Sequence, residues 1–202
     1  MSARDDVLAA VRAALGEDRP DLPAVDRSYR DRDPLPAGAD LVDLFVERVE
    51  DYRAEVTRCA AADLEATVAA ALAGAERVVV PDGLDLAVRG AVPDADLTPT
   101  GLDAVDAVVT RASLGVAETG TLVLTHGPGE GRRAITLVPD VHVCVLPASG
   151  VVRGVTDAVA ALDPVRPQTW VSGPSATSDI ELDRVEGVHG PRTLHVVLVS
   201  DA

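Results

Sequence analysis

The sequence predicts an α/β fold: an open, mostly parallel β-sheet that carries helices on both faces. Three observations support this prediction. The length of 202 residues fits one domain, and 47% hydrophobic residues are enough for a buried core. Apolar, β-branched runs bounded by turn residues, which are typical of buried strands, also alternate with stretches of helical periodicity.

The N-terminal region predicts a helix followed by an extended connector. Ser2 is a suitable N-cap, Gly16 a suitable stop, and one apolar stripe runs between them at Val7, Leu8, Val11 and Leu15. Residues 17–39 hold four prolines and many charges with little periodicity. We therefore divide the chain into 1–39, a helix and proline-rich connector that could serve as an appendage or an oligomer arm, and 40–202, the globular domain.

The globular domain should alternate helices with strands. Expected helices cover 40–52, 63–75 and 151–163, and expected strands cover 54–59, 77–83, 116–126, 141–146, 168–173 and 193–200. A mostly parallel sheet covered on both sides is the natural solution for this order.

Composition excludes several classes of function. The formal net charge is −15, all 18 basic residues are Arg, and aromatic residues are few, so binding to nucleic acid is not expected. The acidic excess leads us to hypothesise adaptation to a cytoplasm of high salt concentration.

Cys59 and Cys144 cannot form a recognisable metal or cluster ligand set. We expect two buried thiols, and a single disulfide between them is the alternative. The N-terminus has neither a signal-peptide core nor a membrane span, so we expect a cytoplasmic protein.

Glu118 is the first candidate for reactivity. It opens the tripeptide ETG before the apolar run TLVL, and a carboxylate beside small residues can act as a nucleophile or base. The alternative is a structural glutamate that accepts hydrogen bonds at the start of a strand, and the sequence leaves both interpretations open.

The segment GPGEGRR at 127–133 is a candidate anion-binding loop. Glycines at alternate positions let the backbone approach a ligand with its N–H groups exposed, and Arg132 and Arg133 could clamp a carboxylate or phosphate. The spacing matches neither the phosphate-binding GxxxxGK[ST] loop nor the dinucleotide GxGxxG motif. A hairpin turn that needs positive φ is the alternative.

The segment SGPSATSDIE at 172–181 and the loop around His189 are further candidates. Ser175, Thr177 and Ser178 could cap a following helix and face an anion at its N-terminus, although a plain capping motif explains them equally well. His189 lies among turn-forming residues and could donate a proton or hydrogen bond. His142 and Cys144 share one face of their strand, but we expect no metal site.

Five strings taken together resemble the LUD domain family of lactate utilization protein C. They are AETGTLVL at 117–124, GPGEGR at 127–132, PDVHVCVL at 139–146, SGPSATSDIE at 172–181 and GVHGPRTLHVVLV at 187–199, and the resemblance covers roughly residues 40–200. It implies a fold similar to the sugar-isomerase and coenzyme A transferase superfamily, with a ligand cleft at strand ends. It also implies a role in oxidising L-lactate to pyruvate with two partner subunits that carry iron–sulfur clusters.

The resemblance also suggests where the site lies. Glu118-Thr119-Gly120 resembles the glutamate, small residue and glycine of coenzyme A transferases, so Glu118 is the candidate catalytic nucleophile. The expected ligand-binding residues are Thr119, Gly120, Thr121, Gly127, Gly129, Gly131, Arg132, Gly173, Ser175, Thr177, Asp179 and His189. Ala176 stands where the family has Arg or Lys, so anion binding here would be weaker or would use Arg132.

Three functions follow from this. The leading one is a non-iron–sulfur subunit of a lactate-oxidising complex that binds a small carboxylate or a nucleotide-like ligand and has no cofactor of its own. A stand-alone transferase or ligase that acts on an acyl, folate or coenzyme A substrate through Glu118 is the second, and a non-catalytic regulatory or scaffolding subunit is the third. Homo-oligomers are compatible with each of them.

Overall fold

The structure is a computed structural model, and it describes residues 2–16, 24–26, 40–72, 74–95, 97–177, 185–186 and 190–200. The chain divides into two compact units, Met1–Pro36 and Ala37–Ala202. Among the described residues, none of the helices combines the length and the apolar composition that crossing a bilayer requires.

The first unit contains the predicted N-terminal helix, α1 (Ala3–Leu15). Ser2 and Asp5 form a capping box, in which the Ser2 hydroxyl accepts from the Asp5 N–H at 3.3 Å and the Asp5 carboxylate accepts from the Ser2 N–H at 3.0 Å. No residue of α1 is buried, and its apolar stripe is exposed.

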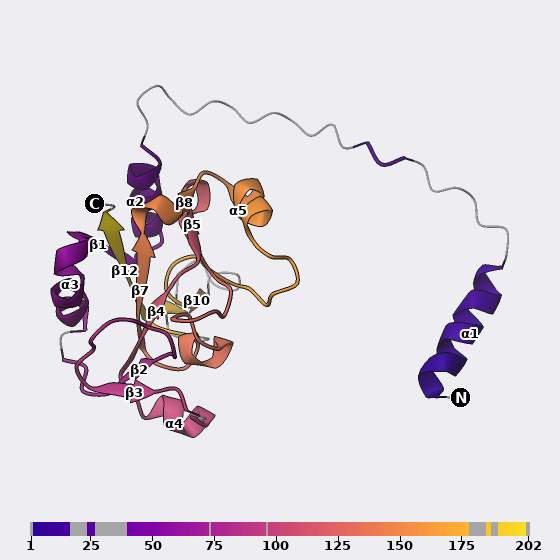
Figure 1. The fold of residues 1–202 in the computed structure, drawn as a ribbon, viewed down its shortest axis with the longest axis horizontal. Coiled ribbons are helices and arrows are strands. Elements are labelled where there is room, and N and C mark those ends of the chain that lie inside the picture. Colours follow the sequence, from indigo (N-terminus) through magenta and orange to yellow (C-terminus); the bar gives the residue numbers. More distant parts are fainter. Residues whose placement is uncertain are drawn as a thin grey trace. The chain divides into compact units, whose positions relative to one another are not determined.

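The second unit is built on a six-stranded parallel sheet in the order β1-β12-β7-β4-β2-β3, and these strands follow one another across the molecule in Figure 1. Its strands are β1 (Glu55–Ala60), β2 (Val78–Val80), β3 (Ala91–Pro93), β4 (Ala107–Arg111), β7 (Val141–Pro147) and β12 (Thr193–Ser200). The α/β fold that the sequence predicts is therefore confirmed.

Helices cover both faces of this sheet, as predicted. Side chains alternate between faces along a strand, so Val143 and its neighbour Cys144 in β7 belong to opposite cores. Val143 lies in the core under α3 (Leu64–Ala71), whereas Cys144 packs in the core of Phe45 and Val49 from α2 (Leu41–Asp51). On the α2 side, α4 (Pro99–Asp103) adds Leu102.

A second sheet, in the order β8-β5-β6-β9, replaces the single strand predicted over 116–126. It consists of β5 (Leu114–Val116), β6 (Thr121–Leu124), β8 (Val151–Val152) and β9 (Thr169–Val171), and β5 pairs antiparallel with β6. Gly120 adopts φ +59°, and this left-handed residue turns the chain back between the two strands. The prediction of one continuous strand is therefore wrong.

Two further predictions of local structure need correction, and one central strand was not predicted. The helix predicted over 151–163 begins only at α5 (Val155–Ala161), after β8. The helix expected after Ser175 is absent at its first positions, where β10 (Ala176–Thr177) pairs antiparallel with β11 (Val185–Glu186). Strand β4 is central and buried, yet no strand is predicted for its sequence AVVTR.

Single turns complete the described elements: Ala61–Asp63, Ala117–Thr119, Arg133–Thr136 and Ala148–Gly150.

The two cysteines are free thiols. Cys144 is fully buried, and this burial raises the pKa of its thiol to about 12. Cys59 is only half-buried, so the expectation of two buried thiols holds for Cys144 alone.

Candidate functional site

A cleft of about 620 Å³ lies where the parallel strands β2, β3 and β4 end. Its lining residues are Pro81, Asp82, Gly83, Asp94, His126, Gly127, Pro128, Gly131, Arg132 and Arg166. The chain leaves β2 toward β3 on one side and leaves β4 toward β7 on the other, so the connections diverge between β2 and β4. In open α/β sheets such a switch point is where ligands bind.

The glycine-rich loop forms one wall of this cleft and is joined to the loop that follows β2. The Gly129 N–H donates to the Asp82 carbonyl at 2.7 Å, and the Gly129 carbonyl accepts from the Arg111 N–H at 2.7 Å, at the end of β4. A Cβ at Gly83 would lie only 2.6 Å from the Cβ of Pro128. The two loops are therefore in direct contact.

The buried carboxylate of Glu130 holds the loop from inside. With only 7% of Glu130 exposed, it accepts from the Ser113 hydroxyl at 2.5 Å, from the Thr125 hydroxyl at 3.2 Å and from the Thr125 N–H. These bonds tie the loop to both strands of the β5–β6 hairpin at its open end. Glu130 thus has a positioning role that the sequence did not reveal.

The N–H groups of residues 127–131 are already engaged within the protein. Gly129 donates to Asp82, Glu130 and Gly131 donate to the Gly127 carbonyl at 3.0 and 3.4 Å, and Gly127 lies 3.5 Å from the Glu130 carboxylate. The expectation that these N–H groups are exposed for an anion is therefore wrong. A ligand in this cleft would thus meet mainly side chains.

His126 closes the base of the loop and is one of two non-glycine residues with positive φ among the described residues, at 59°. Its Nδ1 lies 2.8 Å from the Gly131 carbonyl, and its Nε2 lies 3.0 Å from the Thr169 hydroxyl. Because a carbonyl only accepts, Nδ1 carries a hydrogen. Both ring nitrogens are thus occupied, and His126 acts as a brace for the loop.

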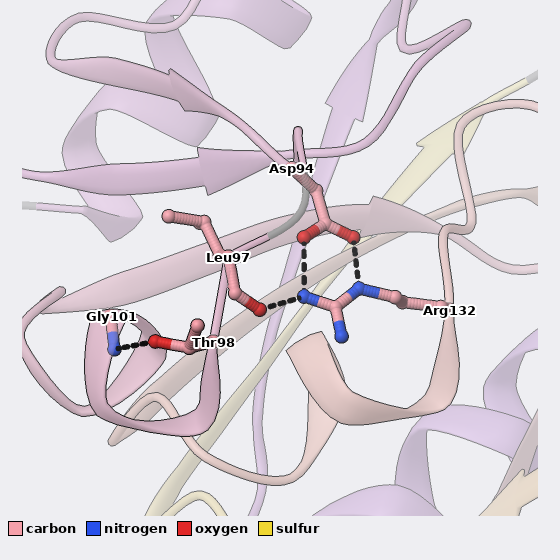
Figure 2. A network of polar contacts seen from close by, with 5 residues as sticks. All are labelled: Asp94, Leu97, Thr98, Gly101 and Arg132. Carbon is pink, nitrogen blue, oxygen red and sulfur yellow. Dashed lines mark hydrogen bonds and ion pairs between the residues drawn. The ribbon is translucent and has the colours of Figure 1, made fainter.

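Arg132, the predicted anion clamp, lines the cleft but is bound to Asp94 (Figure 2). Its Nε and Nη2 both donate to the Asp94 carboxylate at 2.8 Å, and Nη2 also donates to the Leu97 carbonyl at 2.6 Å. The Asp94 side chain is only 8% exposed, so this is a partly buried, forked ion pair. Arg132 therefore links β3 to the glycine-rich loop.

Arg166, on the loop between α5 and β9, is the second arginine of the cleft, and sequence reasoning did not single it out. Its Nη2 would lie 3.2 Å from a Cβ at Gly127. A lone arginine between two elements carries no local signal, so only the folded chain reveals this approach.

Glu118 lies at the turn of the β5–β6 hairpin, and it is absent from the cleft lining. Its carboxylate is 39% exposed and forms an ion pair with Arg153 Nε at 2.9 Å, while its N–H donates to the Arg153 carbonyl at 3.0 Å. The glycine-rich loop follows the opposite end of β6. The structure therefore does not bring Glu118 together with that loop.

The hairpin turn is instead joined to the segment after β9. The Thr121 hydroxyl lies 2.7 Å from that of Thr119 and 2.8 Å from that of Ser172. Gly120 packs against α2, where a Cβ would lie 2.6 Å from the Arg48 carbonyl. The segments 118–121 and 172–173 therefore meet at one end of the hairpin, apart from the cleft.

The remaining predicted residues have individual outcomes. Gly173 has φ +76° and lies against Tyr52, and the Ser175 N–H donates to the Pro191 carbonyl at 2.8 Å. Thr177 belongs to β10, but its side chain lies outside the described part of the structure, as do Asp179 and His189.

A polar cluster is buried beneath the β4–β7 pair. The Thr110 hydroxyl lies 2.8 Å from His142 Nε2 and 3.6 Å from Cys144 Sγ, which confirms that His142 and Cys144 share a face. Complete burial lowers the pKa of His142 to about 4, so its ring is neutral at physiological pH. Within the described residues, no group of three His, Cys, Asp or Glu side chains could hold a metal ion.

Comparison with known proteins extends this description. The model of the LUD domain matches residues 100–199. "Lactate utilization protein C" of Deinococcus radiodurans is 40% identical over 98% of this chain and 96% of its own length. "Lactate utilization protein C" of Bacillus subtilis is 34% identical over 46% of this chain and 42% of its own length. A crystal structure of a DUF162 family protein from Deinococcus radiodurans has a TM-score of 0.68 at 38% identity and covers 79% of this chain and 96% of that one.

Proposed function

The chain belongs to the LUD-domain family of lactate utilization protein C, and on this basis we propose that it is the non-iron–sulfur subunit of an L-lactate oxidation system. The system would convert lactate to pyruvate, with electrons carried by iron–sulfur clusters in partner subunits. The near full-length similarity to a protein named for lactate utilization supports this proposal most directly.

The chain's own residues do not suit an iron–sulfur cluster. Such clusters are held by four thiolates, whereas this sequence has two cysteines. Cys144 is buried with a raised thiol pKa, and Cys59 lies on a different strand of the sheet. Redox centres would therefore belong to the partners, and the task left to this chain is to bind a ligand or a partner.

The cleft at the switch point is the proposed ligand site. Its position at the carboxyl ends of β2, β3 and β4 and its volume of about 620 Å³ are typical of small-molecule sites. Asp82, Asp94, Arg132 and Arg166 supply the charged groups of its lining. A small carboxylate or a nucleotide-like ligand is compatible with this combination.

The stand-alone transferase that would use Glu118 has weaker support. A nucleophilic carboxylate must face bound substrate, whereas the Glu118 carboxylate is paired with Arg153 at the hairpin turn. The neighbouring residues have structural contacts: the Thr121 hydroxyl binds that of Ser172, and Gly120 packs against α2.

The proposed function is tested by lactate oxidation. We expect a mixture of the two iron–sulfur subunits to oxidise L-lactate with an artificial electron acceptor only when this chain is added, and deletion of the gene to abolish growth on L-lactate. Complementation with the wild-type gene should restore growth, and growth on pyruvate serves as the control. Full lactate oxidation without this chain would remove the proposal.

A further inference from the structure

We propose that Arg166 binds the anionic group of the cleft's ligand, that Gly127 provides the space for its guanidinium, and that the ligand is a hydroxycarboxylate. This inference rests on the proposed function and deepens it, because it assigns recognition residues and a substrate class to the place where the proposed ligand cleft meets a second cleft at Arg166. It replaces Arg132, the arginine that the sequence favoured for this role.

Arg166 is the residue that two neighbouring clefts share. Besides the cleft at the switch point, it lines a second cleft of about 440 Å³ at the open end of the β5–β6 hairpin. The second cleft is lined by Ser113, Leu114, Thr125, Ser149, Gly150, Val152, Ala161, Leu162, Asp163 and Arg166. A charge at this junction can be reached by a ligand from either side.

The guanidinium of Arg166 is available for a ligand. The described part of the structure shows no hydrogen bond or ion pair from it, and the residue is exposed. Arg132 and Arg153, by contrast, are held by Asp94 and Glu118. A guanidinium presents a planar fork of N–H donors that matches a carboxylate in a bidentate arrangement.

A side chain at position 127 would press on the guanidinium of Arg166 without straining the backbone. Gly127 does not appear among the glycines with positive φ, so its backbone would accept a side chain. A Cβ there would lie 3.2 Å from Arg166 Nη2 and 3.8 Å from Nη1. The absence of a side chain at position 127 therefore lets the guanidinium lie against the loop.

The hydroxyl of Ser113 is the group that we expect to bind the ligand's hydroxyl. It lies in the cleft that Arg166 also lines, and it donates its hydrogen to the Glu130 carboxylate at 2.5 Å. With its hydrogen used in this way, the Ser113 oxygen accepts from the Thr125 hydroxyl at 2.8 Å, and its second lone pair is left for a ligand hydroxyl. A ligand that carries both a carboxylate and a hydroxyl group would use both Arg166 and Ser113, which line the second cleft together.

The test is calorimetric titration of the full chain with L-lactate, with propionate and inorganic phosphate as comparison probes. We expect wild-type protein to bind L-lactate more tightly than propionate or phosphate. Arg166→Gln should weaken lactate binding by about tenfold or more, since hydrogen bonds to charged groups are lost. Gly127→Ala should weaken it in the same direction without changing any charge, because it displaces the guanidinium.

Two variants separate specific recognition from general effects. Arg89→Gln removes the same charge from an exposed position outside both clefts and should leave lactate affinity within about twofold. Ser113→Ala should remove the preference for lactate over propionate while propionate affinity is kept, and circular dichroism checks that each variant is folded.

Three outcomes would overturn the inference. They are no lactate binding by the wild-type chain, equal losses in the Arg166 and Arg89 variants, and phosphate binding tighter than lactate binding. The test does not depend on the partner subunits. Lactate binding at Arg166 by a chain that proves dispensable for lactate oxidation would keep this site and remove the proposed function.

Discussion

At the scale of single residues, buried and partly buried polar side chains give the candidate site its shape. Three side chains beside the cleft form hydrogen bonds with loop residues that would otherwise lack a partner. They are Glu130, which binds Ser113, His126, which binds Gly131, and Asp94, which binds Arg132. Because an unpaired buried polar group costs about 1–3 kcal/mol, these contacts hold the glycine-rich loop in one conformation. The glycine-rich loop, against which Arg166 lies, therefore has a fixed position.

The two glutamates of the motif region should respond differently to the same substitution. Glu130→Gln places an amide where three donors converge, so we expect the free energy of unfolding to fall by about 1–3 kcal/mol. Glu118→Gln removes an exposed ion pair and should cost within about 1 kcal/mol. Urea denaturation measures both, and equal losses would contradict the assignment of Glu130 as the anchor of the loop.

His142 should make stability depend on pH. Its pKa is about 4 in the folded protein and about 6.5 in an unfolded chain, so the unfolded state binds the proton more readily. Stability from this group is therefore complete above pH 6.5 and is lost as the pH falls from 6.5 to 4, by about 3 kcal/mol.

Urea denaturation at several pH values between 7 and 4 checks this expectation. The matched variant is His142→Gln, whose stability should fall less steeply over the same range, whatever its stability at pH 7. Parallel slopes for the wild type and the variant would show that another group is responsible.

At the scale of elements, the β5–β6 hairpin separates two features that lie close together in the sequence. Its turn, with Glu118, Thr119 and Gly120, packs against α2 and Ser172. Its open end, with Ser113 and Thr125, is tied to the glycine-rich loop through Glu130. A four-residue strand is long enough to place these groups at different ends of the second sheet.

Gly120 provides a test of this arrangement. Gly120→Ala combines the strain of a left-handed conformation, about 1–2 kcal/mol, with contact on the α2 backbone, which should add about 1–3 kcal/mol. The control is Gly74→Ala, because Gly74 also has positive φ but no atom lies within 4 Å of the added Cβ. Thermal unfolding should show a clearly larger loss at Gly120, and equal losses would mean that the turn does not pack on α2.

At the scale of the whole molecule, the charge of −15 is spread over a chain whose basic residues are all arginine. Self-repulsion of this kind weakens the compact state, and salt reduces it because the Debye length falls from about 10 Å at 0.1 M to about 3 Å at 1 M. The described ion pairs account for few of the 33 acidic residues.

We therefore expect the unfolding temperature to rise with KCl between 0.1 and 2 M at pH 7. The control is the same series near pH 4.5, the isoelectric point calculated from the sequence, where the net charge vanishes and the rise should largely disappear. Full stability in dilute buffer at pH 7, with no response to salt, would remove the hypothesis of salt adaptation.

Prediction from sequence succeeded where periodicity is strong and failed where the chain turns. The continuous apolar runs of β7 and β12 and the stripe of α2 were recognised because burial imposes a regular pattern on them. The sequence predicts one strand over residues 116–126 because their apolar character outweighs a single glycine, whose left-handed φ becomes apparent only in the structure. Strand β4 was not predicted because its five residues are too few to show a clear periodicity.

By itself, the sequence determined the α/β class, the positions of several strands along the chain, the family and the position of the glycine-rich loop, because burial pattern and turn residues are local properties of the chain. Only the tertiary structure decided which polar groups meet. It paired Arg132 with Asp94, placed Arg166 against Gly127, and left Glu118 at the other end of its hairpin. The physical reason is that these contacts join residues far apart in the chain, and their partners depend on strand order and hairpin register.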